Sequence, residues 1–247
     1  MLFRSIINSL FAYPLDEESH VNNSAERQQI KLIPLQDGSY TTNKIDACGN
    51  IGFGISTVDQ QDMAPNKNGV YRIETKLNGE KIFSLPFNRF SFAETRHLNQ
   101  LIDYQYYSKS RSRVQKLFVE PSNPLSLYEN VVAEGKLNIK DSLDYNYVIS
   151  VSDFSGNERI IRIPIQGKNS SEIKPKQDLQ TDYFVQANQA FQVEENGIDV
   201  YIPKNSLYQD AYLDINFNGD TVSLHKDEIP IHSNITIGFD ASKYKPE

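Results

Sequence analysis

Histidine is the usual residue for metal binding and acid–base chemistry, and this sequence of 247 residues contains four. No two of them form a His-x-His pair, and none is followed by an acidic residue four positions later. A catalytic zinc ion needs three protein ligands that converge on one point. We therefore expect no metal site, no cofactor and no catalytic residue on this chain, with the histidines in surface or interface positions: His20, His97, His225 and His232.

Motifs for nucleophilic and nucleotide chemistry are also missing. The one cysteine, Cys48, has no histidine near it in the sequence, so we expect a small buried thiol rather than a nucleophile. Gly52 and Gly54 are not followed by the third glycine of a dinucleotide-binding loop. Asp153 and Asn157 could hold calcium through oxygen ligands, but Asp-x-x-Gly-Asn between strands is more typical of a turn.

The segment from Tyr104 to Arg113 is the candidate binding surface. Aromatic rings stack on sugars, and arginines form paired hydrogen bonds with acids, so the segment suits contact with a sugar or an anionic polymer. The alternative, which we favour, is that the tyrosines cover a sheet edge while the basic groups stay in water. The residues concerned are Tyr104, Tyr106, Tyr107, Lys109, Arg111 and Arg113.

Composition excludes several classes of protein. The chain has 32 acidic and 25 basic residues and a net charge of −7, which argues against a nucleic-acid binder. Apolar residues make up 38% of the sequence, enough for a buried core. No run approaches the roughly 18 apolar residues of a membrane span. We therefore expect a folded protein that has no membrane span and does not bind nucleic acid.

Period-two alternation predicts strands in the first part of the chain. Residues 71–77 and 81–85 flank Asn78-Gly79, the strongest short hairpin signal. A second hairpin is expected across residues 145–165. Glycines in the strand over residues 49–56 would allow close backbone approach or a bulge. Ser91 and Glu94 form a capping box before apolar residues at helical spacing, which predicts one short helix over 91–103.

The same alternation returns near the C-terminus, after a polar stretch without periodicity. Strands are expected at residues 198–202 and 213–217, with a turn at Asn218-Gly219, and the last strand at 235–239. The predicted fold class is all-β, with two antiparallel β-sandwich (Ig-like) domains and one short helix inserted in the first. The boundaries are an N-terminal extension at 1–24, a β-sandwich at 25–167, a linker at 168–182, and a second, small or truncated sandwich at 183–247.

The first eleven residues faintly resemble an export signal, with an arginine followed by apolar residues. Asn8 and Ser9 interrupt the apolar stretch, and no small-x-small cleavage site follows it. We therefore expect a strand or linker here in place of a working signal peptide.

Several short motifs follow one another along the chain: Tyr13-Pro14-Leu15-Asp16 with Ser19; Gly49-x-Ile51-Gly52-Phe53-Gly54; Asn68-Gly69-Val70-Tyr71-Arg72-Ile73-Glu74; Phe92-x-Glu94-Thr95-Arg96-x-x-Asn99 with Asp103-Tyr104; Asn123-Pro124-Leu125 with Tyr128; and Asp153-x-x-Gly156-Asn157. Their order resembles that of a known region, the part C-terminal to the catalytic domain in lysostaphin-type (LytM-like) zinc metallopeptidases of Bacteroidetes envelopes. The resemblance covers about residues 13–167 and, more weakly, the second domain.

The resemblance implies a location and a role but no catalysis. In that family zinc is bound through His-x-x-x-Asp and His-x-His motifs in a preceding domain, and neither motif exists here. What the resemblance implies is a non-catalytic accessory region in the periplasm or outside the cell, which positions or regulates a peptidase domain or binds peptidoglycan or envelope glycan. Two alternatives stay open: a fragment of a zinc peptidoglycan endopeptidase whose catalytic domain is encoded upstream, and a carbohydrate-binding module.

Overall fold

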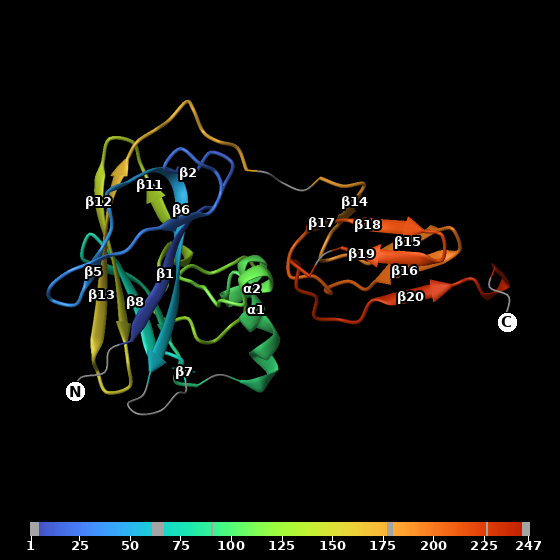
Figure 1. Ribbon diagram of the computed structural model, residues 1–247, viewed down its shortest axis with the longest axis horizontal. Helices are drawn as coiled ribbons and strands as arrows, with labels where there is room; N and C mark the ends of the chain where they lie inside the picture. The colour runs from blue at the N-terminus through green and yellow to red at the C-terminus, as the bar shows by residue number, and fades with distance from the viewer. Residues whose placement is uncertain (1–4, 61–66, 90, 177–179, 226, 244–247) are drawn as a thin grey trace. The chain divides into compact units, whose positions relative to one another are not determined.

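The computed structural model describes residues 5–60, 67–89, 91–176, 180–225 and 227–243 (Figure 1). The chain forms two compact units. The first contains residues 1–103 and 111–177, and the second contains residues 104–110 and 178–247. Strands dominate both units, as the sequence predicts. None of the helices in the described ranges is long and apolar enough to cross a bilayer.

One large mixed sheet forms the first unit. Its main path runs β3-β1-β6-β13-β12-β8-β9, with the shorter strands attached to it. Strand β13 lies parallel to β5 and to the start of β6, so the antiparallel arrangement we expected is wrong for this part of the sheet. Parallel neighbours need a long crossover, and the chain between β6 and β13 supplies it. The strands are β1 (Ile6–Pro14), β2 (His20–Val21), β3 (Gln28–Ile30), β4 (Ile33–Pro34), β5 (Tyr40–Thr41), β6 (Ile45–Gln60), β7 (Lys67–Asn68), β8 (Arg72–Leu77), β9 (Glu80–Pro86), β10 (Gln115–Lys116), β11 (Leu137–Ile139), β12 (Asp144–Ser152) and β13 (Glu158–Gly167).

Both predicted hairpins of this unit are confirmed. Strands β8 and β9 are joined by Asn78 and Gly79, whose φ angles of 50° and 92° fit a type I′ turn. Strands β12 and β13 pair along residues 144–152 and 158–166 and are joined by residues 153–157. In that turn Asp153 accepts hydrogen bonds from the Asn157 backbone N–H at 2.8 Å and from its side-chain amide at 2.7 Å. Both carboxylate oxygens therefore take part in the turn, which is the role we favoured over calcium binding.

The glycines of β6 allow the close approach that the sequence predicts. A Cβ added at Gly52 would lie 2.4 Å from the ring of Phe118, and one added at Gly54 would lie 3.0 Å from Val114. Elsewhere on β6 the ring of Phe53 stacks on Tyr147 of β12 at 4.8 Å. The core of the unit is therefore built around β6, the longest strand.

The first residues of the described chain belong to the sheet and not to an extension. Strand β1 pairs with β6 along residues 6–14 and with β3 along residues 10–12. Leu10 and Ala12 are fully buried in the core. The boundary expected at residue 24 therefore does not separate an extension from the sheet, because alternating apolar residues of β1 complete the core.

The predicted helix at 91–103 is divided into short pieces. A 3-10 helix, η1 (Phe92–His97), is followed by α1 (Leu98–Leu101), and a separate helix, α2 (Tyr104–Ser110), comes next. Ser91 caps η1, since its hydroxyl accepts a hydrogen bond from Ala93 N–H at 3.2 Å, whereas the Glu94 carboxylate of the expected capping box accepts hydrogen bonds from Ser126. The helix ends because Ile102 is extended and bridges to Gln115, while Asp103 N–H bonds to the Val114 carbonyl. A single-turn 3-10 helix, η2 (Ala133–Gly135), lies before β11.

In the ranges that the structure describes, the second unit contains three small sheets around its own core. Strand β14 pairs with β17 in one sheet. In the second sheet β16 lies between β15 and β20, and in the third β18 pairs with β19. The last pair is joined by Gly219-Asp220, one residue later than we predicted, with Gly219 at φ 62° as a type II′ turn needs. The elements are β14 (Tyr183–Val185), β15 (Phe191–Glu195), β16 (Ile198–Ile202), β17 (Ala211–Leu213), β18 (Ile215–Asn218), β19 (Thr221–Leu224), β20 (Thr236–Phe239) and η3 (Ala241–Lys243).

Part of the predicted linker is attached to the first unit. Lys168 N–H bonds to the Ala47 carbonyl, and Lys174 exchanges backbone hydrogen bonds with Asn23 and Ala25. The segment 168–174 therefore has fixed partners although it is polar and lacks periodicity. Hydrogen bonds made by backbone groups leave no pattern in the side chains, which is why the sequence did not reveal them.

Candidate functional site

A buried polar cluster joins the helical segment to the sheet. One oxygen of Asp103 accepts hydrogen bonds from the Tyr13 hydroxyl at 2.9 Å and from an Arg27 guanidinium nitrogen at 2.5 Å. The Asp103 side chain is 8% exposed and that of Arg27 is 30% exposed. The guanidinium also lies over the ring of Phe11, 5.5 Å from its centroid. We call Tyr13, Arg27 and Asp103 the Asp103 cluster.

The surroundings of the cluster also determine the protonation state of Tyr13. Burial raises the pKa of the Tyr13 hydroxyl far above its ordinary value, and the nearby Asp103 charge raises it further. Tyr13 therefore stays protonated and donates. Its ring also packs edge-on against Phe118 at 5.7 Å. The cluster thus ties the end of α1 to β1 and to the chain before β3, a role that motif order alone did not reveal.

Other residues of the motifs also hold loops in place. The Ser19 hydroxyl accepts hydrogen bonds from the backbone N–H groups of Leu15 and Asp16 at 2.9 and 3.0 Å. Glu94 accepts two hydrogen bonds from Ser126, through its backbone N–H and its hydroxyl. These polar side chains stabilise the loops of the first unit.

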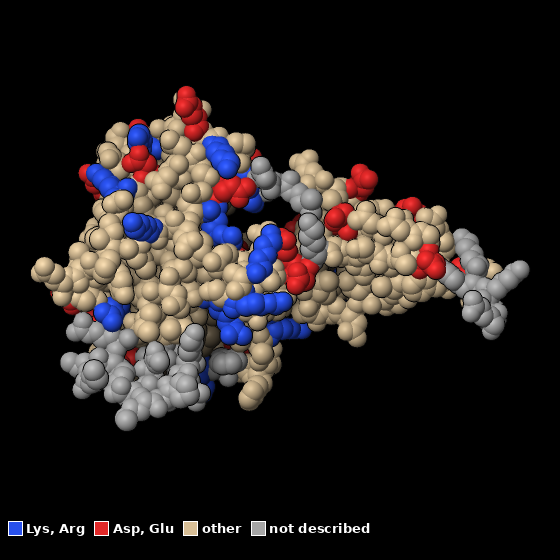
Figure 2. Space-filling model, in the orientation of Figure 1, with Lys and Arg blue, Asp and Glu red and all other residues tan. Residues whose placement is uncertain are grey.

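The predicted binding segment forms α2 and the turn after it. The tyrosines of α2 are partly buried, whereas Lys109, Arg111 and Arg113 are exposed. Rings of Tyr104 and Tyr107 lie 6.2 Å apart. Figure 2 shows Lys and Arg side chains gathered over the helical segment in this view. The segment therefore combines partly covered rings with exposed cations, and the use of Tyr106 as a contact residue stays a prediction.

Within the second unit, α2 contacts one acidic residue. Lys109 forms an ion pair with Glu228 at 2.9 Å, and the Gln105 amide donates to the same carboxylate at 3.0 Å. The helix ends at Ser110, and the next residue, Arg111, has a φ of 58°. Of the basic groups expected to bind a ligand, Lys109 is thus already paired with an acid.

The histidines lie in separate structural settings. His225 Nδ1 accepts a hydrogen bond from Asp214 N–H at 2.9 Å, and the His232 ring packs edge-on against Tyr208 at 4.5 Å. His97 lies within hydrogen-bonding distance of Gln100. In the parts of the chain that the structure describes, no group of three or more His, Cys, Asp or Glu residues could hold a metal ion.

His20 is the histidine that sequence reasoning placed wrongly. It is completely buried on β2, directly opposite Cys48 on β6, and burial lowers the pKa of its ring. Cys48 itself is partly exposed, not fully buried as we expected. The pairing joins residues 28 positions apart, so no local signal could have found it.

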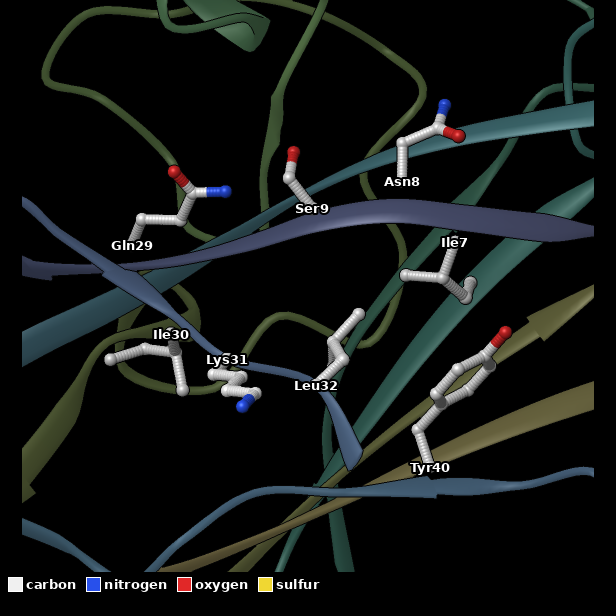
Figure 3. Close-up of a pocket in the computed structure, with 8 residues that line it drawn as sticks. All are labelled: Ile7, Asn8, Ser9, Gln29, Ile30, Lys31, Leu32 and Tyr40. Atoms are coloured by element: carbon white, nitrogen blue, oxygen red, sulfur yellow. The ribbon is translucent and has the colours of Figure 1, made fainter. Parts of the chain in front are cut away.

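A groove opens beside β1 at the edge of the large sheet. It has a volume of about 440 Å³ and lies between β1, β3 and the start of β5. Figure 3 shows Ile7 pointing from β1 toward Leu32 and Tyr40 across the opening. Pockets of this size are typical of ligand-binding sites. We call it the β1 groove; its lining residues are Ile7, Asn8, Ser9, Gln29, Ile30, Lys31, Leu32 and Tyr40.

Comparison with known proteins identifies the second unit. Residues 182–247 match the Zu5-like domain family. The match begins just before β14 and includes every strand of the second unit. No curated protein and no solved structure matches the chain. Residues 182–247 thus carry a Zu5-like domain, and nothing links it to lysostaphin-type peptidases. That this domain is a small sandwich stays a prediction.

Proposed function

We propose that this chain is a non-catalytic accessory region of an exported cell-envelope protein, which positions or regulates a peptidase domain or binds envelope material. The observation that carries the proposal is the Asp103 cluster. Tyrosine and aspartate are residues that could perform acid–base chemistry. Here the aspartate accepts two internal hydrogen bonds and is almost fully buried, so the three residues brace a scaffold.

The envelope location rests on motif order. Tyr13, Ser19, Glu94 and Asp103 belong to the motifs that resemble the region following a lysostaphin-type catalytic domain. All four stabilise loops or join segments through internal hydrogen bonds. Two proteins with the same scaffold are expected to share side chains that hold the scaffold together. The shared motifs therefore support an accessory role for this chain over a catalytic one.

We also propose that the first unit is a β-sandwich. Support comes from β6, which pairs with β1, β10 and β11 along its middle and with β13 at its start. Phe53 on β6 stacks on Tyr147 of β12, although β13 lies between those strands in the sheet. Such a contact brings two layers of strands together over one core.

A co-sedimentation experiment tests the envelope role. Purified chain is mixed with insoluble peptidoglycan, with cellulose as the control polymer, and in parallel with a separately produced lysostaphin-type peptidase domain. The proposal predicts retention on peptidoglycan or a stable complex with the peptidase domain. A chain that stays soluble with peptidoglycan and also fails to bind the peptidase domain would contradict it.

A further inference from the structure

Strand β1 leaves part of its backbone edge without a strand partner in the described part of the chain. On one side it pairs with β6 along residues 6–14. On the other side β3 pairs only with residues 10–12. The N–H and C=O groups of residues 6–9 that face this side have no strand beside them in the ranges described. A free strand edge of this kind is a template for another extended chain.

The neighbouring chain turns away and leaves the β1 groove beside this edge. After β3, residues Ile33–Pro34 form β4 and pair with β5, which in turn pairs with β13. A bulge between Ile7 and Ser9 bends β1 at the same place. The groove therefore lies where β1 and β3 separate, and its walls are fixed by strands on both sides.

Side chains in the groove suit an extended peptide with apolar residues at alternate positions. Ile7 and Ile30 are buried, while Leu32 and Tyr40 are partly exposed and face the opening (Figure 3). Four strand residues span about 13 Å, so the free edge accommodates a short segment. The exposed Lys31 ammonium group beside Leu32 favours a carboxylate on the bound chain.

Arg159 holds Tyr40, one of the residues that line the groove, in place. Its guanidinium donates to the Ser5 carbonyl at 3.3 Å and to the Gly38 carbonyl, and it lies over the Tyr40 ring at 5.8 Å. This residue joins β13 to the chain before β1 and to the loop before β5. The walls are thus braced in the free protein, which reduces the ordering cost of binding.

We propose that the β1 groove binds an extended peptide segment of a partner protein, which adds as a strand to residues 6–9 and places an acidic side chain near Lys31. Backbone hydrogen bonds would supply affinity, and the apolar lining and Lys31 would supply specificity, as in other strand-addition complexes. This assigns a binding site and a partner class that the accessory role does not specify, and it does not depend on an envelope location.

The test uses a defined probe and the full chain. The probe is a blocked octapeptide of alternating valine and threonine with one central aspartate, titrated to millimolar concentration into ¹⁵N-labelled protein. We expect saturable shifts of the amide signals of residues 6–9. An analogue with N-methylated backbone amides at alternate positions lacks the necessary donors and should not bind.

Variants locate the site. Leu32→Asp, which puts a charge on the apolar wall, should weaken binding about tenfold or more. Lys31→Glu should weaken it about threefold, as expected for a charge at the rim. Lys76→Glu, exposed on β8, is the matched control and should change nothing. Circular dichroism and melting curves establish that each variant is folded.

Several outcomes would overturn the proposal. The first is the absence of saturable shifts at residues 6–9, and the second is equal binding of the N-methylated peptide. A third is unchanged binding by folded Leu32→Asp. If the protein instead self-associates with increasing concentration and Leu32→Asp abolishes this, the occupant is a second copy of the chain and the partner-peptide proposal is wrong.

Discussion

Replacing Asp103 with alanine should destabilise the first unit strongly. The substitution leaves the Arg27 cation, whose side chain is 30% exposed, without this acceptor, and it removes the acceptor of the buried Tyr13 hydroxyl. Removing one partner of a fully buried ion pair costs about 3–5 kcal/mol. Because Arg27 retains some contact with water, we expect a loss of about 2–4 kcal/mol in the free energy of unfolding.

Graded substitutions separate the contributions. Tyr13→Phe removes one hydrogen bond to a charged acceptor and should cost about 1.5–3 kcal/mol. The matched control is Asp144→Ala, which breaks the exposed pair between Lys44 and Asp144, whose side chains are 46% and 71% exposed. That change should cost less than about 1 kcal/mol.

Urea unfolding followed by far-UV circular dichroism measures these differences from the midpoint and slope of the transition for each variant. A double-mutant cycle between Arg27→Ala and Asp103→Ala then gives their coupling. An Asp103→Ala variant that loses no more stability than Asp144→Ala would refute the view that this cluster braces the scaffold.

Three further predictions follow from the described contacts. Gly52→Ala should destabilise the protein by about 2 kcal/mol, because the added methyl group would lie 2.4 Å from the Phe118 ring. Gly69→Ala is the control in the same unfolding assay, since a methyl group added there would have no atom within 4 Å. Limited proteolysis should first cut between residues 175 and 182, leaving the segment 168–174 with the first unit; mass spectrometry of an early cut before Lys174 would contradict the backbone pairing there. Tyr106→Ala should lower the melting temperature and leave peptidoglycan binding unchanged, whereas binding lost in folded Tyr106→Ala and Arg111→Ala would establish α2 as a contact surface.

The sequence predicted the local features of the fold well. Alternation located β8, β9, β12, β13 and β16, and Asn78-Gly79 fixed its hairpin because both residues tolerate positive φ. The glycines of β6 marked the close approach of Phe118. These signals are local, since side-chain periodicity and turn chemistry are set by residues adjacent in the chain.

Long-range pairing was beyond the reach of a single sequence. Strand β13 pairs in parallel with β6, and His20 on β2 lies opposite Cys48 on β6. Both pairings depend on which strands meet in space. The Asp103 cluster likewise joins residues 90 and 76 positions apart. The β1 groove arises from where β3 ends its pairing with β1, and no residue type marks that point. Candidate sites built from distant segments therefore required the structure.

The most direct test of the non-catalytic role is an incubation of the full chain with purified peptidoglycan and excess zinc. Pelleted protein and released soluble fragments are measured in the same samples. We expect no release of fragments above the protein-free control, whether or not the protein is retained with the peptidoglycan. Zinc-dependent release of fragments that is abolished by His225→Ala or His232→Ala would contradict it.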